Sequence, residues 1–122
     1  MFKYEKTRRD EAAIFFLQGR VGLEETAVMR KAFWECIVEE NPGCLIVDLS
    51  GVPALDSSVI SLLVATKNAI GKRRGHLLLS GLRRDSYQLF EQTNLHQYFE
   101  IRRTLDEAVE AGRALLAPES SE

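Results

Sequence analysis

The sequence predicts an α/β fold, a single domain whose mixed four- to five-stranded sheet carries about four helices. Three observations support this. The chain has 122 residues, 45% apolar and 28% charged, as is usual for one folded domain. Segments with strand character alternate with segments of helical periodicity, which predicts parallel strands joined by right-handed crossovers. The first two strand segments follow each other directly, which predicts an opening hairpin.

The N-terminal part predicts this hairpin and one long helix. The stretch MFKYEK alternates apolar and polar residues, TRRDEA turns the chain, and AIFFLQGRV reads as a more buried strand. From Glu24 to Glu40, apolar residues recur every three or four positions, which predicts an amphipathic helix ended by Asn41, Pro42 and Gly43. The expected apolar face consists of Val28, Met29, Ala32, Phe33, Cys36 and Ile37.

The run CLIVDLSG is Leu-rich and β-branched and predicts a central strand over Leu45 to Leu49. Because strand side chains alternate, Leu45 and Val47 should face one side of the sheet and Ile46 the other, all three buried. Helical periodicity resumes near Ser57 and continues to about Gly71. The expected inward face of that helix consists of Val59, Leu62, Leu63, Thr66 and Ile70.

The C-terminal part predicts a strand at HLLLSG, a short helix at RRDSYQLFEQTN, a brief strand at YFEI and a last helix from Thr104 to about Leu116. Thr104 and Glu107 have the spacing of a capping box, and Gly112 falls on the apolar face, where it would permit close packing. The domain is expected over residues 1–116, with residues 117–122 as a disordered tail.

Composition and isolated residues argue against several functions. A net charge of −2 and a pI near 5.8 argue against direct binding of nucleic acid. No apolar run approaches the ~18 to 20 residues of a membrane span and no signal peptide is evident, so no membrane insertion and a cytoplasmic location are expected. Cys36 and Cys44 lack CxxC spacing, and His76 and His96 lack the context of a triad base or metal ligand. We therefore expect no catalytic residue, metal or cofactor.

The loop ALDSS follows the central strand, at the edge where open α/β sheets place their ligand sites. Asp56, Ser57 and Ser58 lie where the next helix begins. Asp and Ser are favoured N-cap residues, each worth about 1 kcal/mol, so the local sequence alone favours a purely structural role. A hydroxyl at a helix N-terminus is also accessible, and a phosphate there would face unpaired N–H groups. Both roles remain open, because one residue can cap while another is modified.

The helix after this loop has more apolar residues than one buried stripe needs. Ile60 and Val64 are expected to be at least partly exposed beside Ser57, where they would form part of a partner-binding surface. A charge at either position would then weaken binding more than folding. Burial under a neighbouring helix is the alternative. Trp34 is expected at the edge of its helix, with a role in an interface as its alternative.

Residues 44 to 111 carry a family resemblance. The segment CLIVDLSGVPALDSSVISLLVATKNAIGKRRGHLLLSGL, followed by LFEQTNLHQYFEIRRTLDEAVEA, resembles the STAS domain of anti-sigma factor antagonists and of the cytoplasmic tails of sulphate transporters. VDLSGVPALDSS resembles the strand, loop and D-S-S signature of that family. The resemblance implies that Ser57, directly after Asp56, accepts phosphate. The chain departs from the family pattern at Val59, where Gly is usual, and the loss of a close backbone approach is expected to alter docking at this turn.

The resemblance implies a signalling switch that is not an enzyme. Its partner would be a serine kinase of the Bergerat fold that also serves as an anti-sigma factor, bound through Asp56, Ser57, Ser58, Ile60 and Val64. Phosphorylation would release that partner. One alternative is an adaptor subunit of a phospholipid-transport ATPase or of a stress-signalling assembly, and another is a small-ligand or nucleotide-binding module that uses the ALDSS loop. We expect a monomer or a weak homodimer.

Overall fold

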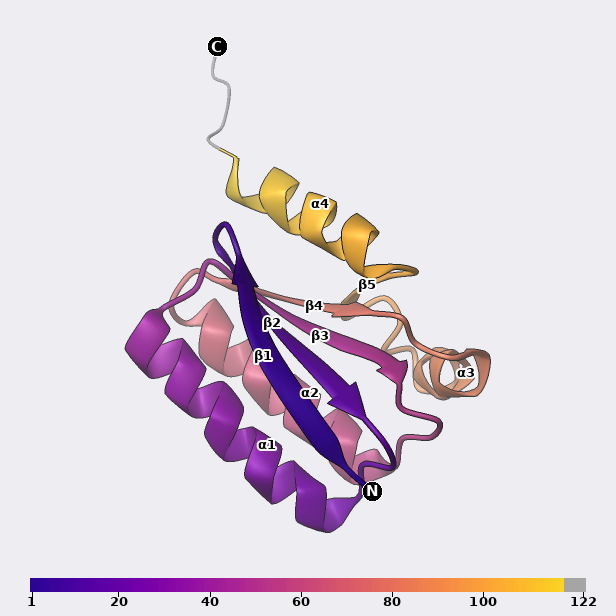
Figure 1. The fold of residues 1–122 in the computed structure, drawn as a ribbon. Coiled ribbons are helices and arrows are strands. Elements are labelled where there is room, and N and C mark those ends of the chain that lie inside the picture. The colour runs from indigo at the N-terminus through magenta and orange to yellow at the C-terminus, as the bar shows by residue number, and fades with distance from the viewer. Residues whose placement is uncertain (118–122) are drawn as a thin grey trace.

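The computed structural model describes residues 1–117, which form one mixed five-stranded sheet with helices on both faces (Figure 1). The strands lie in the sheet in their order along the chain, β1-β2-β3-β4-β5. They are β1 (Lys3–Arg9), β2 (Ala12–Gln18), β3 (Cys44–Gly51), β4 (His76–Ser80) and β5 (Glu100–Arg102). The β1–β2 pair is antiparallel and every other pair is parallel, which confirms the predicted hairpin and the mixed sheet.

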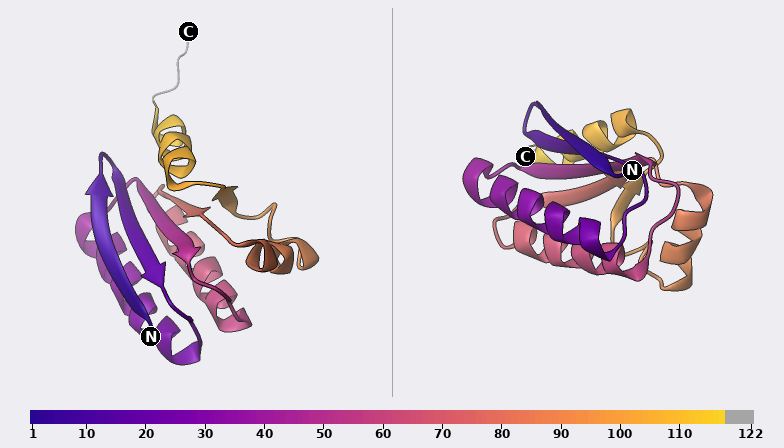
Figure 2. Two further views of the ribbon diagram at one scale, coloured as in Figure 1. Left: turned by 45° about the vertical axis from the view of Figure 1, so that its right-hand side comes forward. Right: turned by 60° about the horizontal axis from the view of Figure 1, so that its bottom comes forward.

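Helices cover the two faces of the sheet unequally. They are α1 (Leu23–Glu35), its π-helical continuation η1 (Cys36–Glu40), α2 (Ser57–Gly71), α3 (Arg84–Gln92) and α4 (Leu105–Leu116). Figures 1 and 2 show α1 and α2 side by side against one face, while α4 lies on the other. Of the tail predicted for residues 117–122, all but Ala117 lies outside the described residues.

Alternation of side chains along β3 divides the core into two layers. Leu45 and Val47 belong to the layer under α1 and α2, Ile46 belongs to the layer under α4, and all three are fully buried, as predicted. Helix α2 begins at Ser57, also as predicted. Its buried residues are the predicted ones: Val59, Leu62, Leu63, Thr66 and Ile70.

The helix predicted over residues 24–40 differs in two respects. Its α-helical part ends at Glu35, and the last five residues form the π-helical turn η1 before Asn41, whose φ of 48° is left-handed. The predicted apolar face was too wide, because Val28 is 51% exposed. Val28 and the buried Met29 are adjacent, and adjacent side chains point about 100° apart on a helix. Only the side toward the sheet and α2 is covered.

Helix α4 packs close to the sheet through Gly112. A Cβ on Gly112 would lie 3.0 Å from the sulfur of Cys44, which confirms the predicted close approach. At the start of the helix, the Thr104 hydroxyl accepts a hydrogen bond from the Glu107 N–H (3.1 Å), so Thr104 is the predicted cap. The Glu107 carboxylate accepts from the Arg103 N–H rather than from that of Thr104. Burial raises the pKa of the Cys44 thiol to about 11.

Candidate functional site

The candidate site lies at the N-terminus of α2, where Asp56 is the N-cap residue. Its backbone is extended, and its carboxylate oxygen Oδ1 accepts hydrogen bonds from the Ser58 N–H (2.9 Å) and from the Ser58 hydroxyl. The bond from the Ser58 hydroxyl is the main cause that lowers the pKa of the Asp56 carboxyl below its ordinary value. The structural role that the local sequence favours is therefore filled by Asp56.

The two serines beside this cap have different environments. Ser58 is half-buried, and its hydroxyl is engaged by Asp56. Ser57 is exposed, and within residues 1–117 its hydroxyl forms no hydrogen bond. Because Asp56 and Ser58 satisfy the cap between them, Ser57 does not take part in holding the helix end. Its side chain is accessible at the molecular surface.

The starts of α1 and α2 lie next to each other at this edge of the sheet. Leu55, just before the site, forms a parallel bridge with Val21, just before α1. Gly22 caps α1 with its backbone, and a Cβ on Gly22 would lie 3.4 Å from Glu25 Oε1 and 3.6 Å from Asp56 Oδ2. The carboxylates of Glu25 and Asp56 therefore approach the same point. Two carboxylates therefore lie near this point before any modification takes place.

A buried carboxylate holds the end of β3, which leads into the site loop. Asp48 is only 7% exposed. Its Oδ1 accepts from the Ser50 N–H (3.1 Å) and hydroxyl (2.6 Å), and its Oδ2 accepts from the Ser80 hydroxyl (2.9 Å). The Arg83 guanidinium donates to the Ser50 carbonyl (3.2 Å). Sequence reasoning missed this cluster, although an Asp within the apolar run LIVDL was a signal that could have found it.

Ile60 and Val64 are half-buried and pack against the core layer under α1 and α2. Their spacing from Ser57, three and seven residues, puts them on the same face of α2 as that serine. Part of this face approaches the segment after α3, since Lys67 Nζ lies 5.0 Å from the ring centroid of Tyr98. Both side chains are therefore partly exposed, as expected, and a charge at either position would disturb packing as well as the surface.

Within residues 1–117, no group of three or more His, Cys, Asp or Glu side chains is placed to hold a metal ion. None of the helices in this range is long and apolar enough to cross a membrane. Trp34 is 56% exposed and borders a groove between α1 and α2 that is separate from the site at Ser57.

The sequence profile of the STAS domain matches residues 3–108, so the chain belongs to the STAS domain family. No curated protein sequence matches it. Among solved structures, it is similar to an anti-sigma factor antagonist from Mycobacterium paratuberculosis, with a TM-score of 0.84 and 23% identity over 93% of this chain and 95% of that one. This likeness shows a shared fold.

Two further solved structures have the same fold. One is an anti-sigma-factor antagonist (STAS) domain protein from Planctomyces limnophilus, with a TM-score of 0.78 and 20% identity over 88% of this chain and 96% of that one. The other is the Bacillus cell fate determinant SpoIIAA in its phosphorylated form, with a TM-score of 0.70 and 17% identity over 91% of this chain and 98% of that one. The resemblance to the STAS domain is thereby confirmed for the fold and the family.

Proposed function

We propose that this chain is an anti-sigma factor antagonist, a cytoplasmic binding protein without catalytic activity that is switched by phosphorylation of Ser57. The observation that carries the proposal is the difference between the two serines: Ser57 is exposed with a free hydroxyl, while Ser58 is half-buried and bound to Asp56. A structural relative, SpoIIAA, is known in both an unphosphorylated and a phosphorylated form, which supports phosphate chemistry on this fold.

The proposed partner is a serine kinase of the Bergerat fold that also acts as an anti-sigma factor. In the unphosphorylated state, Asp56, Ser57 and Ser58 contact this partner, together with the exposed parts of Ile60 and Val64. Phosphate on Ser57 adds a charge of about −1.5 to −2 next to Asp56 and near Glu25. Repulsion between this acidic edge and an acidic partner surface releases the partner. The fold remains intact, because an anion at the start of α2 is favoured by the helix dipole.

The proposal is tested with a candidate kinase from a neighbouring gene, in a phosphorylation reaction followed by mapping of the modified residue by mass spectrometry. We expect phosphate on Ser57 in the wild type and none in Ser57→Ala, while the matched variant Ser58→Ala is still modified. Ser57→Ala should bind the partner constitutively, and Ser57→Asp should bind it weakly with an unchanged fold. Phosphate found only on Ser58, or a Ser57→Asp variant that binds as tightly as the wild type, would contradict the switch.

The same experiment separates the switch from the two alternative functions. An adaptor subunit would bind its partner equally well in the wild type, Ser57→Ala and Ser57→Asp, and a pull-down with mass spectrometry would recover a transporter or a stress-signalling assembly. A small-ligand module would bind a nucleotide in calorimetry without any partner protein. Either result would replace the proposed switch.

A further inference from the structure

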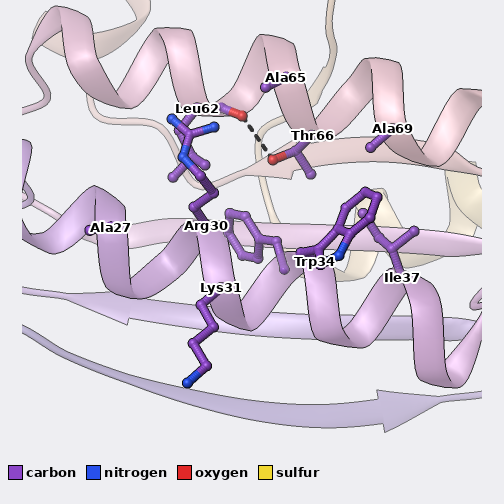
Figure 3. Close-up of a pocket in the computed structure, with 10 residues that line it drawn as sticks. Ala27, Arg30, Lys31, Trp34, Ile37, Leu62, Ala65, Thr66 and Ala69 are labelled. Atoms are coloured by element: carbon purple, nitrogen blue, oxygen red, sulfur yellow. Dashed lines mark hydrogen bonds between the residues drawn. The ribbon is translucent and has the colours of Figure 1, made fainter.

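We propose that the groove between α1 and α2 is a second docking surface, which binds an amphipathic helix of a partner protein that carries acidic side chains beside its apolar stripe. Figure 3 shows this groove with its lining residues. Its volume is about 450 Å³. It exists because small residues line both helices where larger ones would fill the gap: Ala27 on α1, and Ala65 and Ala69 on α2.

The groove has an apolar floor. Phe33, Ile37 and Leu62 line it and are buried. Thr66 also lines it, but its hydroxyl donates to the Leu62 carbonyl within α2 (2.8 Å; dashed line in Figure 3), so it presents no free polar group. An occupant of this floor must therefore be apolar on the side that it inserts.

Exposed apolar side chains continue the groove along α1. One face of the helix carries the apolar residues Leu23, Ala27 and Trp34 together with Arg30, because these four residues follow one another at spacings of four, three and four. Leu23 is 74% exposed and Trp34 is 56% exposed, and tryptophan is among the residues that are enriched in the hot spots of interfaces. The stripe is about 16 Å long at 1.5 Å per residue, which matches about three turns of a bound helix.

The charge beside the groove decides which kind of helix fits. Arg30 extends toward α2, whereas Lys31 points away from it (Figure 3). Within residues 1–117, neither cation forms a salt bridge. An acidic residue on the occupant would therefore find an unpaired arginine at the border of an apolar floor. A basic occupant would be repelled there.

A second copy of this chain fits the same surface less well. Arg30 and Lys31 stand near the middle of α1, so a two-fold contact between two α1 helices would bring like charges together. The groove is also separate from the surface proposed at Ser57. Ala65 and Ala69 line it, whereas Ile60 and Val64 lie on another side of α2. The residues that line the groove therefore do not overlap with those proposed to contact the partner at Ser57.

Trp34 is the only tryptophan, so its fluorescence reports occupancy of the groove directly. The probe is a stapled helical peptide of about 14 residues with Leu along one face and Glu beside it, compared with a peptide in which every Glu is Lys. We expect the Glu peptide to shift the Trp34 emission to the blue and to bind about tenfold or more tightly than the Lys peptide, less so at high salt. Arg30→Glu should reverse this preference.

Two variants complete the test, each checked by thermal melting. Ala65→Glu puts an acid into the groove and should abolish binding of the Glu peptide, whereas Leu115→Glu, an equally acidic change on α4 across the sheet, should leave it unchanged. Ser57→Asp should also leave binding of the Glu peptide unchanged, so the test of the groove is independent of the test of the proposed switch. Equal binding of both peptides, no shift with either, or a dimer that Ala65→Glu dissociates in light scattering would overturn the proposal.

Discussion

Replacement of Asp56 by Ala should show how much the cap at the start of α2 contributes to the stability of the fold. The change removes the oxygen that accepts from the Ser58 N–H and hydroxyl, and loss of such a cap costs about 1 kcal/mol. For a chain of 122 residues, an unfolding entropy of about 2.1 cal/mol/K per residue converts this into a fall of about 4 °C in Tm. Asp56→Asn keeps an accepting oxygen and should cost only a few tenths of a kcal/mol. Urea and thermal melts measure both variants.

The stability lost in Asp56→Ala should also depend on pH. The pKa of Asp56 is lowered in the folded state, chiefly by the hydrogen bond from the Ser58 hydroxyl. The ionised carboxylate therefore stabilises the fold above its unfolded pKa, and this contribution is lost as the pH falls through the lower, folded pKa. The difference in stability between wild type and Asp56→Ala should narrow on acidification. The stability of Asp56→Asn should not itself follow this titration, because the amide does not titrate, so its difference from the wild type should change with pH by the same amount as that of Asp56→Ala.

The control for these melts is Glu91→Ala, which removes an exposed carboxylate on α3 and should change the stability very little. A Ser57 hydroxyl could take over the cap in Asp56→Ala, so the double variant Asp56→Ala/Ser57→Ala is measured as well. If that double variant melts like the wild type at neutral pH, the carboxylate does not stabilise α2 and the assignment of Asp56 as the cap is wrong.

Two further predictions concern packing. Ile60→Asp and Val64→Asp should each lower the free energy of unfolding by about 1 to 3 kcal/mol in denaturant melts, because both residues are half-buried. The isosteric Val64→Thr should cost less stability and still test partner binding. Wild-type stability of the Asp variants would place both side chains outside the packed layer. Gly112→Ala should destabilise the fold by about 1 kcal/mol, since its Cβ would lie 3.0 Å from the Cys44 sulfur. In a Cys44→Ala background the same change should stabilise the fold, because the sulfur is gone and alanine has the higher helix propensity. Additive effects of the two changes in the double variant would contradict the clash.

The sequence was most informative where a single physical rule decides the structure. Alternation along β3 predicted the faces of Leu45, Ile46 and Val47, because this strand is buried on both faces of the sheet. The periodicity of α2 predicted its buried residues, because this helix buries one face against the core. The start of α2 at Ser57 followed from the run of Asp and Ser after an apolar strand. The family resemblance rests on these same residues.

Other features depend on contacts that periodicity does not encode. The apolar pattern of α1 included Val28, but which apolar residues of a helix are covered depends on where the sheet and α2 lie. Local residue preferences could not distinguish the two serines, since either can hydrogen-bond to Asp56, and only the family resemblance pointed to Ser57. Only the geometry, in which Ser58 donates to that carboxylate, leaves the Ser57 hydroxyl free. The groove beside Trp34 likewise required the relative placement of two helices.

Val59 illustrates how packing changes the meaning of a residue. In the family pattern, Gly follows the two serines, and Val was expected to alter docking by blocking a close approach to the backbone. In the structure, the Val59 side chain is 1% exposed and belongs to the core layer under α1 and α2. A side chain that points into the core cannot obstruct a partner that approaches from solvent. Its burial instead anchors the first turn of α2, which fixes the position from which Ser57 is presented.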